Sequence, residues 1–345
     1  MDRPEPSALS GGSRRLIELG DTDALLFHVN GLISDRDWPQ LGALREGCRD
    51  AVERGKQLWS VAAHIEYRLC LQGPADWAAW MLETASGRFA LGPLPEVAAS
   101  THTWAELAPH LTGTPQAAMA AHERVLHGED LADDPVASRL PEVLEMPLKT
   151  LPWEPAYALA EYHPEKMGAP PPAMPLLGPV PSAVPGAGGA GSGAPNRDEV
   201  SEALEELVNI WSTESNGRVA ALSLSGDACT AVEALGSPMA RVAELSGAEA
   251  LALMAWAAAS GGAHGRRRGA AAGRFAAWWV VGALGDLSDR WPAPPEDMAD
   301  ALGTARWYAW EPQEISLGWS LRLALEVTRG NRQGRAWALS ATDQV

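Results

Sequence analysis

A segment rich in proline and glycine divides the chain into two parts. Residues 168–195 hold eight prolines and seven glycines among 28 residues. Such a segment buries too little apolar surface to offset the entropy that it loses on ordering. We therefore predict a flexible linker over residues 168–196, which joins a first domain of residues 1–167 to a second of residues 197–345. With 345 residues, the chain is long enough for each domain to bury its own core.

The first domain has helical periodicity nearly throughout. Apolar residues such as Leu41, Leu44 and Cys48 recur at intervals of three and four, as they do on the buried face of a helix. Asp37 and Asp76, each followed by a tryptophan, open two predicted helices and lie 39 residues apart. That distance matches the period of HEAT-type helical repeats. We predict an all-α domain, which is either an array of HEAT-like repeats or an irregular helical bundle.

The second domain combines strands with helices. Its apolar patterning predicts four strands, at Arg218–Ser225, Arg241–Leu245, 317–328 and 336–341. The last two are joined by a polar turn and form a hairpin. Between the early and the late strands, Ser246 and Glu249 have the spacing of a capping box that opens a helix. We predict a small α+β domain with a largely antiparallel sheet, and an α+β fold overall.

Residues 261–275 carry an unusual ladder of glycines. Glycine recurs at every fourth position, and four arginines lie among the glycines: Gly261, Gly265, Gly269 and Gly273, with Arg266, Arg267, Arg268 and Arg274. Each glycine inside a helix costs roughly 1 kcal/mol relative to alanine. The segment therefore needs either a close approach of two backbones or a loop that only glycine can form.

Two interpretations of this segment stay open. If a helix runs on from about His264, the glycines form one face that packs closely against another element. If the segment is instead a turn before a new helix, its amides and arginines face an anion, as helix starts commonly do. The second interpretation gives the candidate ligand-binding residues, which are His264, Arg266, Arg267, Arg268 and Arg274. The segment lacks the spacing of a Walker A loop or a dinucleotide fingerprint.

Charge and cysteine content limit the class of protein. A formal net charge of −17 argues against general binding of nucleic acid or of anionic membranes, because both need a basic face. A local basic patch in the second domain is compatible with that charge, since seven of its basic residues are Arg266, Arg267, Arg268, Arg274, Arg329, Arg332 and Arg335. Three scattered cysteines predict free thiols, and we find neither a signal peptide nor an apolar span. These features predict a cytoplasmic protein.

The motifs that invite a catalytic interpretation fail on spacing. His122 and His127 are five residues apart, whereas zinc proteases need histidines four apart on one helical face. Ser225 follows a predicted strand but lacks the leading glycine of a nucleophile elbow. We therefore assign no catalytic residue and predict no metal site and no cofactor, and the sequence favours a protein that is not an enzyme.

Four runs of sequence resemble a family of uncharacterised proteins from actinobacteria. They are residues 53–59, 87–94 with 97–107, 260–279 and 307–310. The resemblance covers both domains and omits the linker. It implies a bacterial, cytoplasmic protein, and it implies no activity and no active-site residue.

Two functions from different classes follow. The leading hypothesis is a non-enzymatic interaction or regulatory protein, in which a helical platform is tethered to a small α+β domain and binds one or more protein partners. The alternative is an enzyme or sensor that binds an anionic, phosphate-like or nucleotide-like small molecule near residues 266–274. The two hypotheses differ in whether the arginines of that segment contact a ligand.

Overall fold

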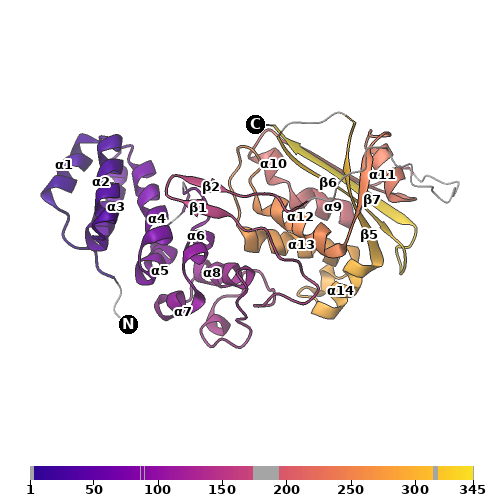
Figure 1. Cartoon of the computed structure of the whole chain (residues 1–345), viewed down its shortest axis with the longest axis horizontal. Helices are drawn as coiled ribbons and strands as arrows, with labels where there is room; N and C mark the ends of the chain where they lie inside the picture. The colour runs from indigo at the N-terminus through magenta and orange to yellow at the C-terminus, as the bar shows by residue number, and fades with distance from the viewer. Residues whose placement is uncertain (1–3, 86, 89, 174–193, 314–317, 345) are drawn as a thin grey trace. The chain divides into compact units, whose positions relative to one another are not determined.

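The computed structural model describes residues 4–85, 87–88, 90–173, 194–313 and 318–344 (Figure 1). The chain divides into two compact units. The first consists of Met1–Val143, Pro147–Lys149 and Ala160–Gly168. The second consists of Leu144–Met146, Thr150–Leu159 and Ala169–Val345. Most of the predicted linker, residues 174–193, lies outside the described residues, so the predicted domain boundaries stay a prediction.

The first unit is helical, as predicted. Its helices are α1 (Gly11–Leu19), α2 (Thr22–Ser34), α3 (Trp38–Glu53), α4 (Trp59–Gln72), α5 (Ala75–Thr84), α6 (Leu94–Thr101), α7 (Trp104–Leu107) and α8 (Pro115–Leu126). A two-stranded hairpin, β1 (Glu161–His163) and β2 (Lys166–Gly168), completes it. Polar side chains start α2 and α3, since Asp21 accepts a hydrogen bond from Ala24 N at 3.0 Å and Asp37 accepts one from Gln40 N at 3.2 Å. The HEAT-like repeat stays a prediction.

A buried ion pair joins two of these helices. Arg45 of α3 donates from Nε and Nη2 to Glu66 Oε1 of α4, at 3.0 and 2.7 Å. Its guanidinium also lies over the ring of Trp80, 5.4 Å from the centroid. The side chains of Arg45 and Glu66 are 0% and 6% exposed. The pair therefore lies within the core of the first unit, with both charges held by groups of the chain itself.

The second unit is built on a five-stranded antiparallel sheet. Its strands are β3 (Arg218–Ser225), β4 (Arg241–Leu245), β5 (Ala305–Glu311), β6 (Trp319–Val327) and β7 (Arg335–Asp343), in the order β3-β7-β6-β5-β4. The four predicted strands correspond to β3, β4, β6 and β7, and β6 and β7 form the predicted hairpin. The sequence did not predict β5. These strands confirm the α+β fold class.

Helices cover both faces of this sheet (Figure 1). They are α9 (Glu199–Leu207), α10 (Ile210–Thr213), α11 (Ala228–Ala234), α12 (Gly247–Ala259), α13 (Ala270–Leu284) and α14 (Pro295–Thr304). The larger core lies between one face and α9, α12 and α13, and it buries Trp211, Trp278, Trp307 and Trp337. A smaller core lies under α11 on the other face, where Tyr308 and Trp310 are buried. The predicted capping box of Ser246 and Glu249 starts α12.

Helices α12 and α13 approach each other at Gly273. A Cβ atom built on Gly273 would lie well inside the contact distance of the Ala255 carbonyl oxygen, and 2.9 Å from the Ala259 Cβ. Gly282, nine residues further along the same helix, is also buried, but a Cβ there would meet its nearest atom, on Trp291, only at 3.7 Å. Of these two glycines, only Gly273 is required for the contact between the helices.

We expect Gly273→Ala to lower the free energy of unfolding by on the order of 1–3 kcal/mol, because the added methyl group overpacks a filled interior. Gly282→Ala is the matched control, and there alanine gains up to about 1 kcal/mol of helix propensity without a clash. Urea denaturation of both variants measures the difference. Equal stability of the two variants would show that α12 and α13 do not touch at Gly273.

Candidate functional site

Residues 260–269 form a loop between α12 and α13. The expectation that a helix runs on from about His264 is wrong for this stretch. Gly262 and Gly269 have φ angles of 71° and 102°, a left-handed backbone that a right-handed helix does not contain. Gly261 and Gly265 face each other across the turn, so closely that a Cβ on either would overlap the other's carbonyl oxygen. These glycines therefore allow the backbone of the loop to adopt its conformation. Among the four regularly spaced glycines, Gly273 alone allows two helices to pack closely.

The loop amides are hydrogen-bonded to side chains of the second unit. Ala263 N donates to Asp343 Oδ2 at 2.5 Å, His264 N donates to Ser215 Oγ at 3.1 Å, and Arg266 N donates to Glu214 Oε2 at 3.4 Å. Two of these three acceptors are carboxylates. Side chains of the chain itself thus occupy three of the loop amides, where the sequence analysis placed a bound anion.

The predicted ligand-binding side chains separate into two places. The structure brings His264, Arg266 and Arg268 together on the loop, with exposed side chains, and Arg267 beside them is half-buried. Arg274 lies apart from them, on α13, where its side chain is 2% exposed. Whether the loop binds an anion stays a prediction, and Arg274 belongs to a different cluster.

Arg274 forms a two-pronged ion pair with Glu154. Its Nε donates to Glu154 Oε2 and its Nη2 to Glu154 Oε1, each at 2.7 Å. The same carboxylate accepts hydrogen bonds from Leu151 N at 2.9 Å, Tyr157 Oη at 2.5 Å and Trp278 Nε1 at 3.1 Å. Burial, and then the charge of Glu154, raise the pKa of the Tyr157 hydroxyl well above its usual value, so this group stays a donor.

The Glu154 cluster is closed to ligands. Both oxygens of the carboxylate are engaged, and its side chain has no exposed surface. The Arg274 guanidinium also lies over the Trp278 ring, 5.3 Å from the centroid. Such a cluster holds residues 150–159 against α13, and it is a structural feature of the second unit.

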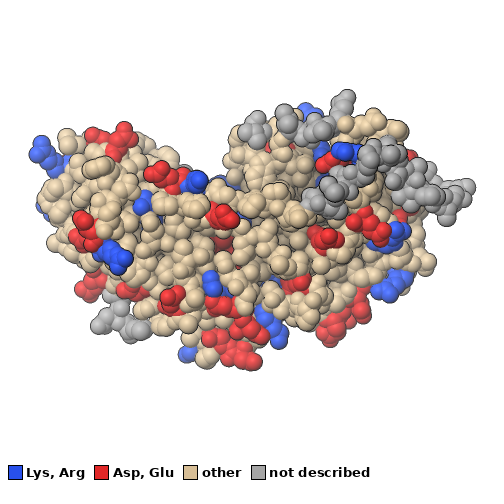
Figure 2. Space-filling model, in the orientation of Figure 1, with Lys and Arg blue, Asp and Glu red and all other residues tan. Residues whose placement is uncertain are grey.

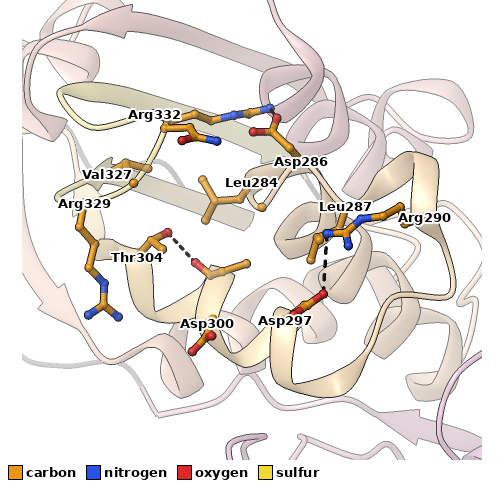
Figure 3. A pocket seen from close by; sticks show the side chains of 14 residues that line it. Leu284, Asp286, Leu287, Arg290, Asp297, Asp300, Thr304, Val327, Arg329 and Arg332 are labelled. Carbon is orange, nitrogen blue, oxygen red and sulfur yellow. Dashed lines mark hydrogen bonds and ion pairs between the residues drawn. The ribbon is translucent and has the colours of Figure 1, made fainter.

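A pocket of about 370 Å³ opens at another part of the second unit (Figure 3). It lies among the end of α13, helix α14 and the turn between β6 and β7. Leu284, Ala301 and Val327 contribute apolar surface to it. Its rim carries three arginines and three aspartates, which are Arg290, Arg329, Arg332, Asp286, Asp297 and Asp300. The volume lies within the range of small-molecule sites, and the lining combines apolar with charged side chains.

Comparison with known proteins places the chain in a family. A family model described as a family of unknown function, DUF6183, matches residues 23–344. The chain belongs to DUF6183. This membership confirms the resemblance to an uncharacterised family, and the actinobacterial origin that the resemblance implied stays a prediction. No curated protein and no solved structure matches the chain.

In the described part of this DUF6183 chain, no three side chains of His, Cys, Asp or Glu come together as ligands for a metal ion. Across the same residues, none of the helices is long and apolar enough to span a membrane. Its cysteines Cys48, Cys70 and Cys229 form no disulfide bond, and burial raises the pKa of the Cys48 thiol to about 12.

Sequence reasoning missed two features of the DUF6183 chain. Nothing near Glu154 indicates a partner 120 residues later in the chain, so the sequence contained no signal for this pair. The pocket had a partial signal, because Arg329 and Arg332 were among the basic residues gathered in the second domain. Their place beside Asp300 of α14 follows only from the fold.

We expect Arg274→Met to lower the free energy of unfolding by about 3–5 kcal/mol, because it leaves the Glu154 charge buried without its partner. The double variant Arg274→Met, Glu154→Leu should lose less stability than the two single changes added together, since no buried charge remains. Arg268→Met makes the same change at an exposed position and should stay within about 0.5 kcal/mol of the parent. Urea denaturation measures all of these, and strictly additive losses would contradict a coupled pair.

Proposed function

We propose that this chain is a non-enzymatic, cytoplasmic interaction protein, and that the outer face of α2 is the surface through which its helical unit docks. One observation carries the proposal. Phe27 and Gly31 lie one turn apart on this face, and no contact within the unit explains either an exposed phenylalanine or a glycine at these positions. The three cysteines form no disulfide bond, and this supports a reducing compartment.

Phe27 lies on the solvent side of α2. Leu25, Val29 and Leu32 point into the core of the unit, whereas the Phe27 side of the helix is opposite to them and the residue is 81% exposed. Burial of such a side chain contributes about 1.5–3 kcal/mol, and this contribution is absent while the ring faces water. Asn30 on the same side is held in place by Arg68 Nη1, which donates to its Oδ1 at 2.7 Å.

Gly31 lies one helical turn after Phe27, and it also faces solvent. Its backbone is helical, and a Cβ atom built on it would meet nothing within 4 Å. Neither a left-handed φ nor a close neighbour within the unit therefore accounts for glycine here, although glycine costs the helix about 1 kcal/mol relative to alanine. A partner that approaches the backbone of α2 closely does account for it.

The partner that fits this face is a second copy of the same chain. In a two-fold symmetric pair, both copies use the same surface, so that if one residue contacts a second residue of the partner, the second also contacts the first. The face of α2 holds both a protruding ring, Phe27, and an open space, above Gly31. Two antiparallel copies of α2 can each place Phe27 over Gly31 of the other, so that a single helix supplies both halves of the contact.

Internal pairing of charge supports the non-enzymatic part of the proposal. The buried charged clusters described above, Glu154 with Arg274 and Glu66 with Arg45, have their hydrogen-bonding groups engaged within the chain. In the view of Figure 2, acidic and basic side chains are interspersed, without a continuous basic area. Both observations favour recognition by shape and apolar contact over catalysis or nucleic-acid binding.

We expect the parent protein to dimerise in sedimentation-velocity experiments at concentrations up to roughly 0.1 mM. Phe27→Glu should raise the dissociation constant at least about tenfold, because it removes a central apolar anchor. Met239→Glu is the matched control, since Met239 is an exposed apolar residue of the second unit, 51% exposed, and should leave the dimer intact.

Gly31→Ala separates docking from folding. Alanine should raise the stability of the monomer by up to about 1 kcal/mol, while its methyl group weakens the dimer by holding the partner's ring away. A parent protein that stays monomeric would overturn the second-copy proposal, as would a dimer that neither substitution affects.

The anionic-ligand hypothesis is the second proposal, and the exposure of His264, Arg266 and Arg268 on one loop favours it. Because Arg274 is paired with Glu154, the ligand would have to be held by the loop side chains alone. A thermal-shift screen with nucleotides and phosphorylated metabolites tests this. We expect any stabilisation to disappear in Arg266→Ala, Arg268→Ala, and its persistence in that variant would contradict a site on the loop.

A further inference from the structure

We infer that the pocket between α14 and the β6–β7 turn binds a small zwitterion, an α-amino acid with an apolar side chain. The inference rests on which charges at the rim of the pocket have partners within the chain and which do not. It is independent of the docking face on α2, because the two sites lie in different units and share no residue.

Two arginines at the rim are already paired. Arg332 Nη2 forms an ion pair with Asp286 and lies 3.7 Å from Glu199 Oε2. Arg290 Nη2 lies 3.7 Å from Asp297 Oδ2 (Figure 3). These pairs border the pocket and leave little charge of either sign to attract a ligand.

Arg329 and Asp300 form no ion pair with any residue that the structure describes. Arg329 Nη2 donates to the carbonyl oxygen of Gly303 at 3.0 Å, which anchors the guanidinium at the end of α14 and leaves its other N–H groups for a ligand. Gly303 leaves room for it, because a Cβ at that position would lie 3.3 Å from Nη2. Asp300 is exposed, one turn before Gly303 on the same helix.

The two unpaired charges are of opposite sign and line one pocket, and Figure 3 shows Thr304 on the same side of it as both. A carboxylate fits Arg329, whose planar guanidinium binds carboxylates with two parallel hydrogen bonds. An ammonium group fits Asp300. The Thr304 hydroxyl donates to Ala301 O at 2.7 Å, so its oxygen keeps lone pairs that accept from the ammonium group.

The other residues that line the pocket determine which side chain the ligand can have. Leu284, Ala301 and Val327 offer apolar surface to a side chain. A purely anionic ligand would meet the unpaired carboxylate of Asp300 at the same rim, and a purely cationic one would meet the unpaired guanidinium of Arg329. Only a ligand with both charges close together matches both unpaired groups without opposing either.

Isothermal titration calorimetry of the full chain with the twenty L-amino acids tests the inference. We expect saturable binding of at least one apolar amino acid, with a dissociation constant in the millimolar range or tighter. The matching amine, which lacks the carboxylate, and the N-acetyl derivative, which lacks the ammonium charge, should each bind at least tenfold more weakly. The absence of binding by all twenty amino acids would overturn the inference.

Variants locate the site. Arg329→Met and Asp300→Asn should each raise the dissociation constant at least tenfold, and their melting temperatures should stay close to the parent's because both side chains are exposed. Arg218→Met and Asp23→Asn make the same changes at exposed positions outside the pocket and should bind like the parent. Inorganic phosphate serves as the competing probe, and phosphate binding that depends on Arg329 but not on Asp300 would show an anion site instead and overturn the zwitterion.

Discussion

The buried carboxylate of Glu154 is the interaction on which the second unit most depends. It lies in a segment that precedes the predicted linker, and it is hydrogen-bonded by Arg274 and Trp278, which follow that linker. A charge taken out of water is tolerated only where partners satisfy it. The pair is therefore better regarded as a device that fixes position than as a source of net stability. It requires residues 150–159 to fold with the second unit.

The helix that carries Arg274 is fixed on two sides by consecutive residues. Gly273 brings its backbone against α12, and Arg274 points about 100° further around the helix to reach Glu154. A larger residue at position 273 would separate the helices, and a neutral residue at position 274 would leave the carboxylate uncompensated. The end of the glycine and arginine segment is thus explained by packing and pairing within the unit, and only its first part, residues 261–269, has exposed side chains for other contacts.

Local sequence patterns predicted most of the strands and helix starts, but they did not predict the contacts between residues that are distant in the sequence. Alternation along β3, β6 and β7, and the capping box of Ser246, were readable because each depends on residues close in sequence. Strand β5 was not, because it lies between two cores, with Trp307 in one and Trp310 in the other, and such a strand shows no alternation. The Glu154–Arg274 pair and the pocket rim required long-range topology, which no local pattern contains.

The same residue types serve structure or recognition according to what surrounds them. Gly273 and Gly31 both lie inside helices with ordinary backbone angles, and each gives up the helix propensity of alanine. At Gly273 the reason is visible within the unit, since α12 fills the space where a side chain would be. At Gly31 the space is open, so the reason lies outside the chain. Arginine follows the same logic, because Arg274 is neutralised by Glu154 whereas Arg329 forms no ion pair among the described residues. We therefore infer recognition sites where the described chain leaves a charge without an ion pair, as at Arg329, or a space beside a glycine that no side chain fills, as at Gly31.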